Sequence, residues 1–230
     1  MRSPTAKDFG SIATPFSYSI ENVSLALCPI QNTATEQKIR KTLRCRKEEI
    51  CSWTIKKRSV DARRKPELFF VYTIAVKTKN DSGMLHKCRN RNVTLFNKKD
   101  YSLPESGKEV LTSRPVVVGF GPAGLFCAYH LAEAGYRPIV LERGSSMEKR
   151  ILDVEQFWNG EMLSERSNVQ FGEGGAGTFS DGKLNTMVKD EKGRGKRILE
   201  LFSMAGADKA ICYENKPHIG TCLLYTSRCV

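Results

Sequence analysis

Three glycines in one short segment have the spacing that binds the diphosphate of a dinucleotide. The segment runs Gly119-Phe120-Gly121-Pro122-Ala123-Gly124 directly after the apolar run Val116–Val118, and Glu142 follows 23 residues after the first glycine. In this fingerprint the first glycine permits a tight turn, the second admits the pyrophosphate, and the third lets a helix pack closely on a strand. Amides at the helix N-terminus face the diphosphate, and Glu142 would accept from the ribose hydroxyls and repel a 2′-phosphate. The pattern predicts a site for an ADP-bearing cofactor, and it fits FAD and NAD alike.

The flanking residues predict the elements that hold this turn. A strand is expected at residues 116–118, a helix directly after the glycines, and a second strand at 138–141 that ends on the acid. Cys127 lies in that helix and is expected to be a small buried residue. We therefore predict an α/β domain of Rossmann type over residues 115–221.

Two further helices are expected in this domain. Ser145 and Glu148 have the spacing of a capping box, which predicts a helix through about Trp158. Phe157 and Trp158 at its end are expected to pack in the core; the alternative is that they cover a flavin. A second helical region covers residues 194–205. His218 follows in a proline-containing turn, where it is either a turn histidine or a group facing a substrate.

A second glycine-rich segment occupies residues 172–182, with five glycines in eleven residues. Such a composition is entropically costly in a plain connector, and it suits backbone that passes close to a flat or anionic ligand. Thr178 and Ser180 would supply hydroxyl donors, and Lys183 would neutralise phosphate or a reduced flavin. The alternative is a flexible surface loop. Because an NAD domain has no general need of a second glycine segment here, the loop favours FAD.

Two stretches carry a resemblance to a known family. RPVVVGFGPAGLFCAYHLAEAGYRPIVLERG and SNVQFGEGGAGTFSDGKL are similar to bacterial FAD-dependent dehydrogenase-like flavoproteins, whose reaction is largely unassigned, and IKKRSVDARRKPELFFVYTIAV resembles their small N-terminal domain. The resemblance covers about residues 20–221 and implies FAD as the cofactor of an oxidoreductase, with NAD(P)H as a candidate electron donor. The residues implied to contact FAD, beside Pro122 and Lys183 named above, are Gly119, Gly121, Ala123, Gly124, Glu142, Arg143, Gly174, Gly175, Gly177 and Thr178.

The same resemblance predicts that the chain is a fragment. Members of the family run on through a substrate-facing region and a late strand-Gly-Asp segment that returns to the flavin, and residues 222–230 do not continue their pattern. We therefore expect an incomplete FAD domain at 115–221, a non-native tail at 222–230, weak or absent retention of FAD, and no activity of the fragment alone.

Basic residues are concentrated ahead of this domain. Residues 1–114 hold 23 of the 37 basic and 11 of the 25 acidic residues, so they carry the whole net charge of +12. Two regions of such different charge predict two structural units. We expect a poorly ordered N-terminus at 1–19, a small basic domain at 20–102 and a linker at 103–114.

The basic domain has the pattern of a small α+β fold. Alternation over residues 23–27 predicts a strand, and a capping box at 33–36 opens a short helix whose apolar stripe is Ile39 and Leu43. Further strands are expected around Trp53 and Ile55, at 68–76, and at 93–96. The order strand, helix, strand, strand suggests a sandwich of ferredoxin-like type.

Two basic runs in this domain, residues 56–58 and 63–65, leave two interpretations open. With aromatic residues nearby they could form an RNA-binding face, since phosphate contacts dominate nucleic-acid affinity. Charge runs on small domains are more often solvated faces, and strands need such aromatic residues for their core. Nucleic acid is therefore a candidate partner that the sequence does not favour. Two alternatives to an oxidoreductase of unknown substrate stay open: an RNA-binding or RNA-modifying flavoprotein that uses the basic domain, and a non-enzymatic module that senses NAD or FAD.

The composition and the absence of certain sequence patterns argue against membrane, secreted and metal-binding proteins. No apolar run approaches the ~20 residues of a membrane helix, and the first 20 residues lack a signal-peptide core, so we expect a cytoplasmic protein without membrane contact. The eight cysteines contain no Cys-x-x-Cys, and no metal site is predicted. His86 and His130 are expected to be structural. The sequence identifies no catalytic residue, substrate or oligomeric state.

Overall fold

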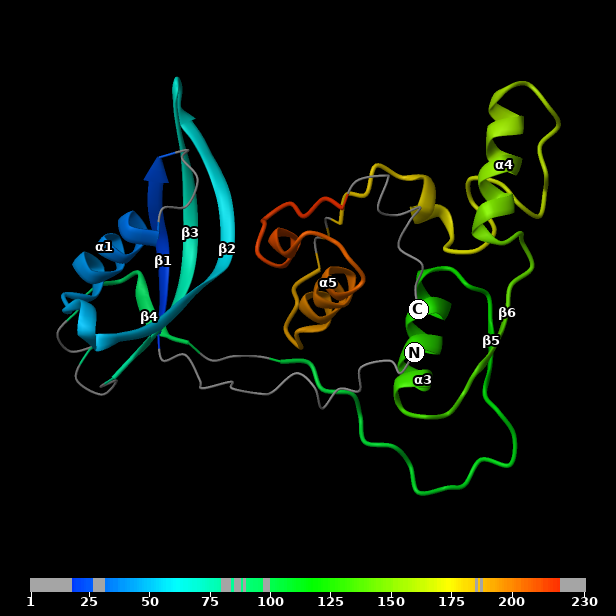
Figure 1. Cartoon of the computed structure of the whole chain (residues 1–230), viewed down its shortest axis with the longest axis horizontal. Coiled ribbons are helices and arrows are strands. Elements are labelled where there is room, and N and C mark those ends of the chain that lie inside the picture. Colours follow the sequence, from blue (N-terminus) through cyan, green and yellow to red (C-terminus); the bar gives the residue numbers. More distant parts are fainter. Residues whose placement is uncertain are drawn as a thin grey trace. The chain divides into compact units, whose positions relative to one another are not determined.

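A computed structural model describes residues 18–26, 32–79, 84, 88, 90–96, 100–184, 186 and 188–219. The chain forms two compact units, and each is described by itself (Figure 1). Unit 1 comprises Met1–Asp100, Glu191–Gly193 and Cys212–Asn215; unit 2 comprises Tyr101–Asp190, Arg194–Ile211 and Lys216–Val230. None of the helices in the described ranges has the length and apolar character to cross a membrane.

Unit 1 is built on an antiparallel four-stranded sheet. Its elements are β1 (Tyr18–Ala26), α1 (Asn32–Leu43), the 3₁₀ turn η1 (Lys47–Glu49), β2 (Ile50–Arg64), β3 (Glu67–Thr78) and β4 (Val93–Leu95). The strand order is β2-β3-β1-β4, and every neighbouring pair is antiparallel. The predicted strands and helix are all present. The helix begins at Asn32, one residue before the predicted capping box, and Leu27 lies outside the described residues.

The core of unit 1 lies between α1 and one face of β3. Ile39 and Leu43 are fully buried, as their spacing on one helical stripe predicts. They pack with Tyr72, Ile74 and Val76, which alternate along β3 and therefore share one face of the sheet. The same cluster takes in Met84, Cys88 and Val93.

Unit 2 contains a small parallel sheet and three helices. Its elements are β5 (Val116–Val118), α3 (Pro122–Glu133), β6 (Ile139–Leu141), α4 (Met147–Trp158), the 3₁₀ turn η2 (Ala176–Phe179) and α5 (Arg194–Met204). The 3₁₀ turn η3 (Lys209–Cys212) follows, and its last residue belongs to unit 1. β5 pairs in parallel with β6, Val116 opposite Ile139 and Val118 opposite Leu141. The turn of the fingerprint thus joins a strand to a helix in a β-α-β unit, as predicted. Residues 103–114 contain no helix or strand.

Helix α5 packs against α3. The rings of Phe126 and Phe202 meet edge to face at 5.9 Å between centroids, a favoured geometry for aromatic pairs. Beside them, Arg197 donates to Glu133 at 3.1 Å. This contact holds the helix that follows the glycine turn.

Three expectations for unit 2 were wrong. Cys127 is exposed, because it lies on a face of α3 other than that of the buried Ala128. Phe157 and Trp158 are 39% and 62% exposed, so they do not pack in a core. The capping box does not form either, since α4 has Ser146 as its N-cap and uses no side chain of its own segment.

The first amide of α4 is capped from a distant part of the chain. The Met147 N–H donates to Oε2 of Glu173 at 2.6 Å. Glu173 belongs to the second glycine segment, so the start of this helix and that loop are tied together. Ser145 instead donates its hydroxyl to Asp153 at 2.9 Å.

Candidate functional site

Two of the three glycines in the turn between β5 and α3 cannot be replaced by a larger residue without backbone strain or collision. Gly119 has a φ of +91°, in the region that favours glycine, and its N–H donates to the Leu141 carbonyl at 2.7 Å. A Cβ on Gly124 would lie 1.9 Å from the Gly119 carbonyl oxygen, closer than any real contact. The positive φ therefore requires glycine at the first position, and the close packing of α3 on the turn requires glycine at the third, as the fingerprint predicts.

The N-terminus of α3 is open to a ligand. Gly121 is the N-cap and brings no side-chain cap, Pro122 occupies the first turn, and Pro122 and Ala123 are exposed. The first amides of a helix have no partner within it, and they carry the positive end of the helix dipole. A Cβ on Gly121 would meet only Gly175 Cα, at 4.0 Å. A pyrophosphate can therefore approach this backbone.

Glu142 lies at the end of β6 and faces the same turn. Its Oε2 accepts from the Phe120 N–H at 2.7 Å, and its Oε1 accepts from the Gly144 N–H at 2.8 Å. The Gly144 N–H and then the Phe120 N–H lower the pKa of this carboxyl, and the charge of Arg150 adds to the effect. The carboxylate therefore stays ionised, and each oxygen retains a lone pair for a ribose hydroxyl.

The structure brings the second glycine segment directly onto the turn. The Gly174 N–H donates to the Phe120 carbonyl at 2.9 Å. Gly175 has a φ of +70°, and a Cβ on it would lie 3.0 Å from Pro122 Cδ and 3.1 Å from Gly121 Cα. Two segments about 50 residues apart thus meet at one helix N-terminus.

A buried arginine that the sequence analysis missed holds this loop in shape. Arg150 in α4 is fully buried and donates to backbone carbonyls of Asn168, Val169, Gly172 and Glu173, at distances from 2.6 to 3.4 Å. Its guanidinium also lies 4.9 Å from the Phe179 ring. One signal could have identified it: Arg150 lies four residues before Val154, on the stripe of α4 that is buried.

The other predicted ligand residues lie in this loop or beside it, and their contacts differ. Arg143 lies 5.5 Å over the Phe171 ring. Thr178 is buried, and its hydroxyl is 3.5 Å from Arg150 Nη1, so it contacts the interior of the loop. Gly177 is exposed, with open space where a Cβ would point. Ser180 donates its hydroxyl to the Gly177 carbonyl at 2.7 Å.

Lys183 lies at the far end of the loop. Its ammonium pairs with Asp181 at 2.7 Å, and both side chains are exposed. Residues 182–184 pair antiparallel with residues 217–219, which places His218 opposite Lys183. His130 contacts Glu133 on α3 at 3.1 Å, whereas His86 lies outside the described residues. The geometry assigns no acid or base to a reaction.

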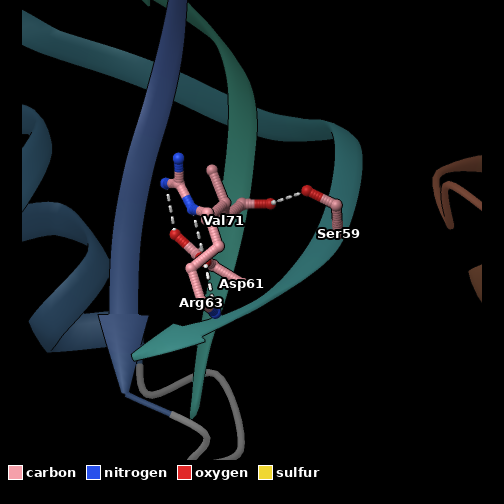
Figure 2. A network of polar contacts seen from close by, with 4 residues as sticks. All are labelled: Ser59, Asp61, Arg63 and Val71. Atoms are coloured by element: carbon pink, nitrogen blue, oxygen red, sulfur yellow. Dashed lines mark hydrogen bonds and ion pairs between the residues drawn. The ribbon is translucent and has the colours of Figure 1, made fainter. Parts of the chain in front are cut away.

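In unit 1, each of the two basic runs contains an arginine that is paired with a carboxylate of the same chain. Arg63 binds Asp61 through Nε at 2.8 Å and Nη2 at 2.6 Å, which lowers the Asp61 pKa to about 2 (Figure 2). On the same strand Ser59 donates to the Val71 carbonyl of β3 at 3.5 Å. Arg58 forms an ion pair with Glu214 and lies 5.0 Å over the Phe70 ring.

Comparison with known proteins gives two findings. Residues 19–77, which span β1 to β3, match a family described as a domain of unknown function (DUF8436). Over 205 residues the chain is 44% identical to an uncharacterized protein of Clostridium beijerinckii, and the alignment covers 89% of this chain and 38% of that protein. The chain thus spans less than two fifths of the length of this relative.

Proposed function

We propose that this chain carries the ADP-binding half of an FAD-dependent oxidoreductase similar to the dehydrogenase-like flavoproteins. The observation that carries the proposal is the meeting of the two glycine segments, with Gly175 packed on Gly121 and Pro122 at the start of α3. A nucleotide diphosphate bound there would face helix amides and the backbone of both segments. The second segment favours FAD over NAD, since the ADP fingerprint alone is complete without it.

Each residue group has a defined part in binding. The amides at the start of α3 hold the diphosphate, Glu142 holds the ribose and disfavours a 2′-phosphate, and Arg150 fixes the second segment without facing the ligand. Gly177, with its open face, lies along the bound cofactor, and Lys183 supplies positive charge at the end of the loop. FAD, when bound, supplies the redox chemistry, with NAD(P)H as the candidate electron donor and a small molecule as substrate.

The architecture around the site supports a Rossmann-type domain that extends past two strands. Parallel strands normally have both faces covered. Here Val116, Val118 and Leu141 are 55%, 82% and 52% exposed, although all three are apolar. For unit 1, we propose a ferredoxin-like fold, since β3 lies between β1 and β2 and is antiparallel to both.

Titration of the purified chain with FAD, ADP, NAD and 2′,5′-ADP tests the proposal. We expect ADP and FAD to bind with dissociation constants within about threefold of each other, a difference of about 0.7 kcal/mol, because the identified contacts all address the ADP half. 2′,5′-ADP should bind at least about tenfold more weakly, since Glu142 repels its 2′-phosphate. Failure of both ADP and FAD to bind would refute the proposal.

An experiment on the longer relative distinguishes an enzyme from a module that only senses the nucleotide. Purified full-length C. beijerinckii protein should be yellow, and NADH or dithionite should bleach its visible flavin absorbance. Bound FAD that neither reductant can reduce would favour a sensing role. A colourless protein that cannot be reconstituted with FAD would argue against both.

A further inference from the structure

Unit 1 contains a polar cavity at the end of α1 that has no part in the dinucleotide site. Its volume is about 460 Å³, within the usual range for small-molecule sites. The last turn of α1 and the residue after it form one wall, and the segment that leads into β4 forms the other. The lining residues are Lys41, Thr42, Arg44, Cys88, Asn90, Arg91 and Asn92.

The charge of this cavity is uniformly positive. Lys41, Arg44 and Arg91 line it together, and the lining residues include no carboxylate. Among the described residues none of these three cations forms an ion pair. Three like charges around one polar cavity repel one another, and a bound anion would relieve that repulsion.

The negative end of the α1 dipole, which would oppose an anion here, is partly covered. The Arg40 carbonyl accepts from the Cys45 N–H at 3.2 Å. The Thr42 carbonyl accepts from the Cys88 thiol at 2.9 Å, and burial raises the pKa of that thiol, so it stays a neutral donor. Two carbonyls at the end of α1 are therefore bonded to donors within the chain.

The opposite wall adds neutral donors in a fixed turn. Asn90 accepts with its side-chain oxygen from the Asn92 N–H at 3.0 Å, and its backbone carbonyl accepts from the Val93 N–H at 3.0 Å. Such an Asx turn holds the Asn90 side chain in place, with its amide nitrogen as the donor end. Arg91, between the two asparagines, is thereby held beside the cavity.

From these observations we propose that the cavity binds a phosphate group, either as inorganic phosphate or on a small phosphorylated ligand. Two guanidinium groups and one ammonium match the charge and the several acceptor oxygens of a phosphate. The volume of about 460 Å³ is that of a small-molecule site, so we assign the cavity to a small ligand rather than to a nucleic-acid backbone, which binds along a longer groove. The site is separate from the dinucleotide site and does not depend on it.

A titration of the labelled full-length chain with inorganic phosphate, followed by backbone amide shifts, tests this proposal. We expect saturable shifts confined to residues 41–44 and 90–92, larger affinity for AMP or phosphate than for adenosine, and no equal effect of chloride at matched ionic strength. The cavity residues belong to unit 1 and the dinucleotide turn belongs to unit 2, so shifts at residues 41–44 and 90–92 are read separately from shifts at residues 119–124. Shifts that do not saturate, or that chloride reproduces, would overturn the proposal.

A matched pair of triple variants provides the second measurement. Lys41→Gln with Arg44→Gln and Arg91→Gln should weaken phosphate binding at least tenfold. The control changes Lys57, Arg64 and Lys65 to Gln; it removes the same charge from exposed positions of the hairpin and should leave binding unchanged. If both triple variants bound phosphate equally weakly, the loss would come from the lower net charge alone, and the proposal of a specific site would be wrong. Binding of a short RNA that displaces phosphate and is lost only in the cavity variant would assign the site to nucleic acid instead.

Discussion

Glycine in the turn can be required by packing within the chain or by the space that a bound diphosphate needs. Alanine at Gly124 tests the first reason, and alanine at Gly121 tests the second. At Gly124 a Cβ would lie 1.9 Å from the Gly119 carbonyl, so helix and strand must separate by more than about 1 Å. Overpacking of this kind costs up to about 3 kcal/mol, of which about 1 kcal/mol is offset by the better helix propensity of alanine. We expect a net loss near 2 kcal/mol in the stability of unit 2, together with loss of ADP binding.

At Gly121 the chain itself accommodates a methyl group. Its backbone has φ −75° and ψ −175°, which any residue adopts, and the nearest atom to a Cβ is 4.0 Å away. We expect Gly121→Ala to leave stability within about 0.5 kcal/mol of the original. Binding of ADP should still fall at least about tenfold, or 1.4 kcal/mol, because the methyl group occupies the approach of the pyrophosphate.

The assay can be confined to unit 2 because each unit contains one tryptophan, Trp53 in unit 1 and Trp158 in unit 2. In a Trp53→Phe background, denaturant unfolding followed by fluorescence reports unit 2 alone, and calorimetry gives the ADP affinity. Gly107→Ala, in the segment without regular structure, is the control for a glycine with open space around it. If Gly121→Ala binds ADP like the original, no diphosphate lies on this turn and our reasoning fails.

Three further predictions test the surroundings of the site and the hairpin of unit 1. Arg150→Met should lower the free energy of unfolding by at least about 3 kcal/mol, because several buried carbonyls lose a charged donor. Hydrogen exchange should rise across residues 168–179. The control Lys149→Ala removes only an exposed i,i+4 pair and should lower that free energy by about 0.5 kcal/mol. Glu142→Gln should reduce the preference for ADP over 2′,5′-ADP. In the original protein the pKa of Glu142 lies below its ordinary 4.5. The carboxylate therefore stabilises the fold fully above about pH 4.5, and this stabilisation is lost as the pH falls through the lowered value, which denaturation across pH would detect. Carbon-13 titration should place the pKa of Asp61 at about 2, and Arg63→Gln should return it toward 3.8; an unchanged value in that variant would contradict the paired geometry.

The fold was predictable wherever local patterns determine it. The alternation along β3, the helical stripe of Ile39 and Leu43 and the glycine turn each specify an element through their own residues. The errors arose where distant residues decide. The cap of α4 comes from Glu173, whose position depends on the second glycine segment, so no signal near Ser145 could reveal it.

The candidate site divides in the same way. Glycine spacing predicts that a nucleotide turn exists, but the contact between Gly175 and Gly121 depends on how residues 143–171 return the chain to α3. Arg150 was missed because a buried arginine on an apolar stripe contradicts the usual pattern of exposed charge. The carbonyls that offset the cost of burying it come from residues 168–173, which no pattern within α4 reveals. Exposure of Trp158 likewise depends on which surfaces α4 meets.

The glycines of the two segments also differ in what requires them. Gly124 and Gly175 are required by contacts within the chain, since a Cβ on either would collide with neighbouring backbone or with Pro122. Gly121 and Gly177 have no positive φ and have room for a Cβ, so the folded chain alone would accept alanine at both. Glycine is entropically costly in the unfolded chain, and these two positions gain nothing from it in the structure itself. A ligand that passes close to the backbone at both positions would explain glycine there, and the cofactor that we propose would then run from the start of α3 toward η2.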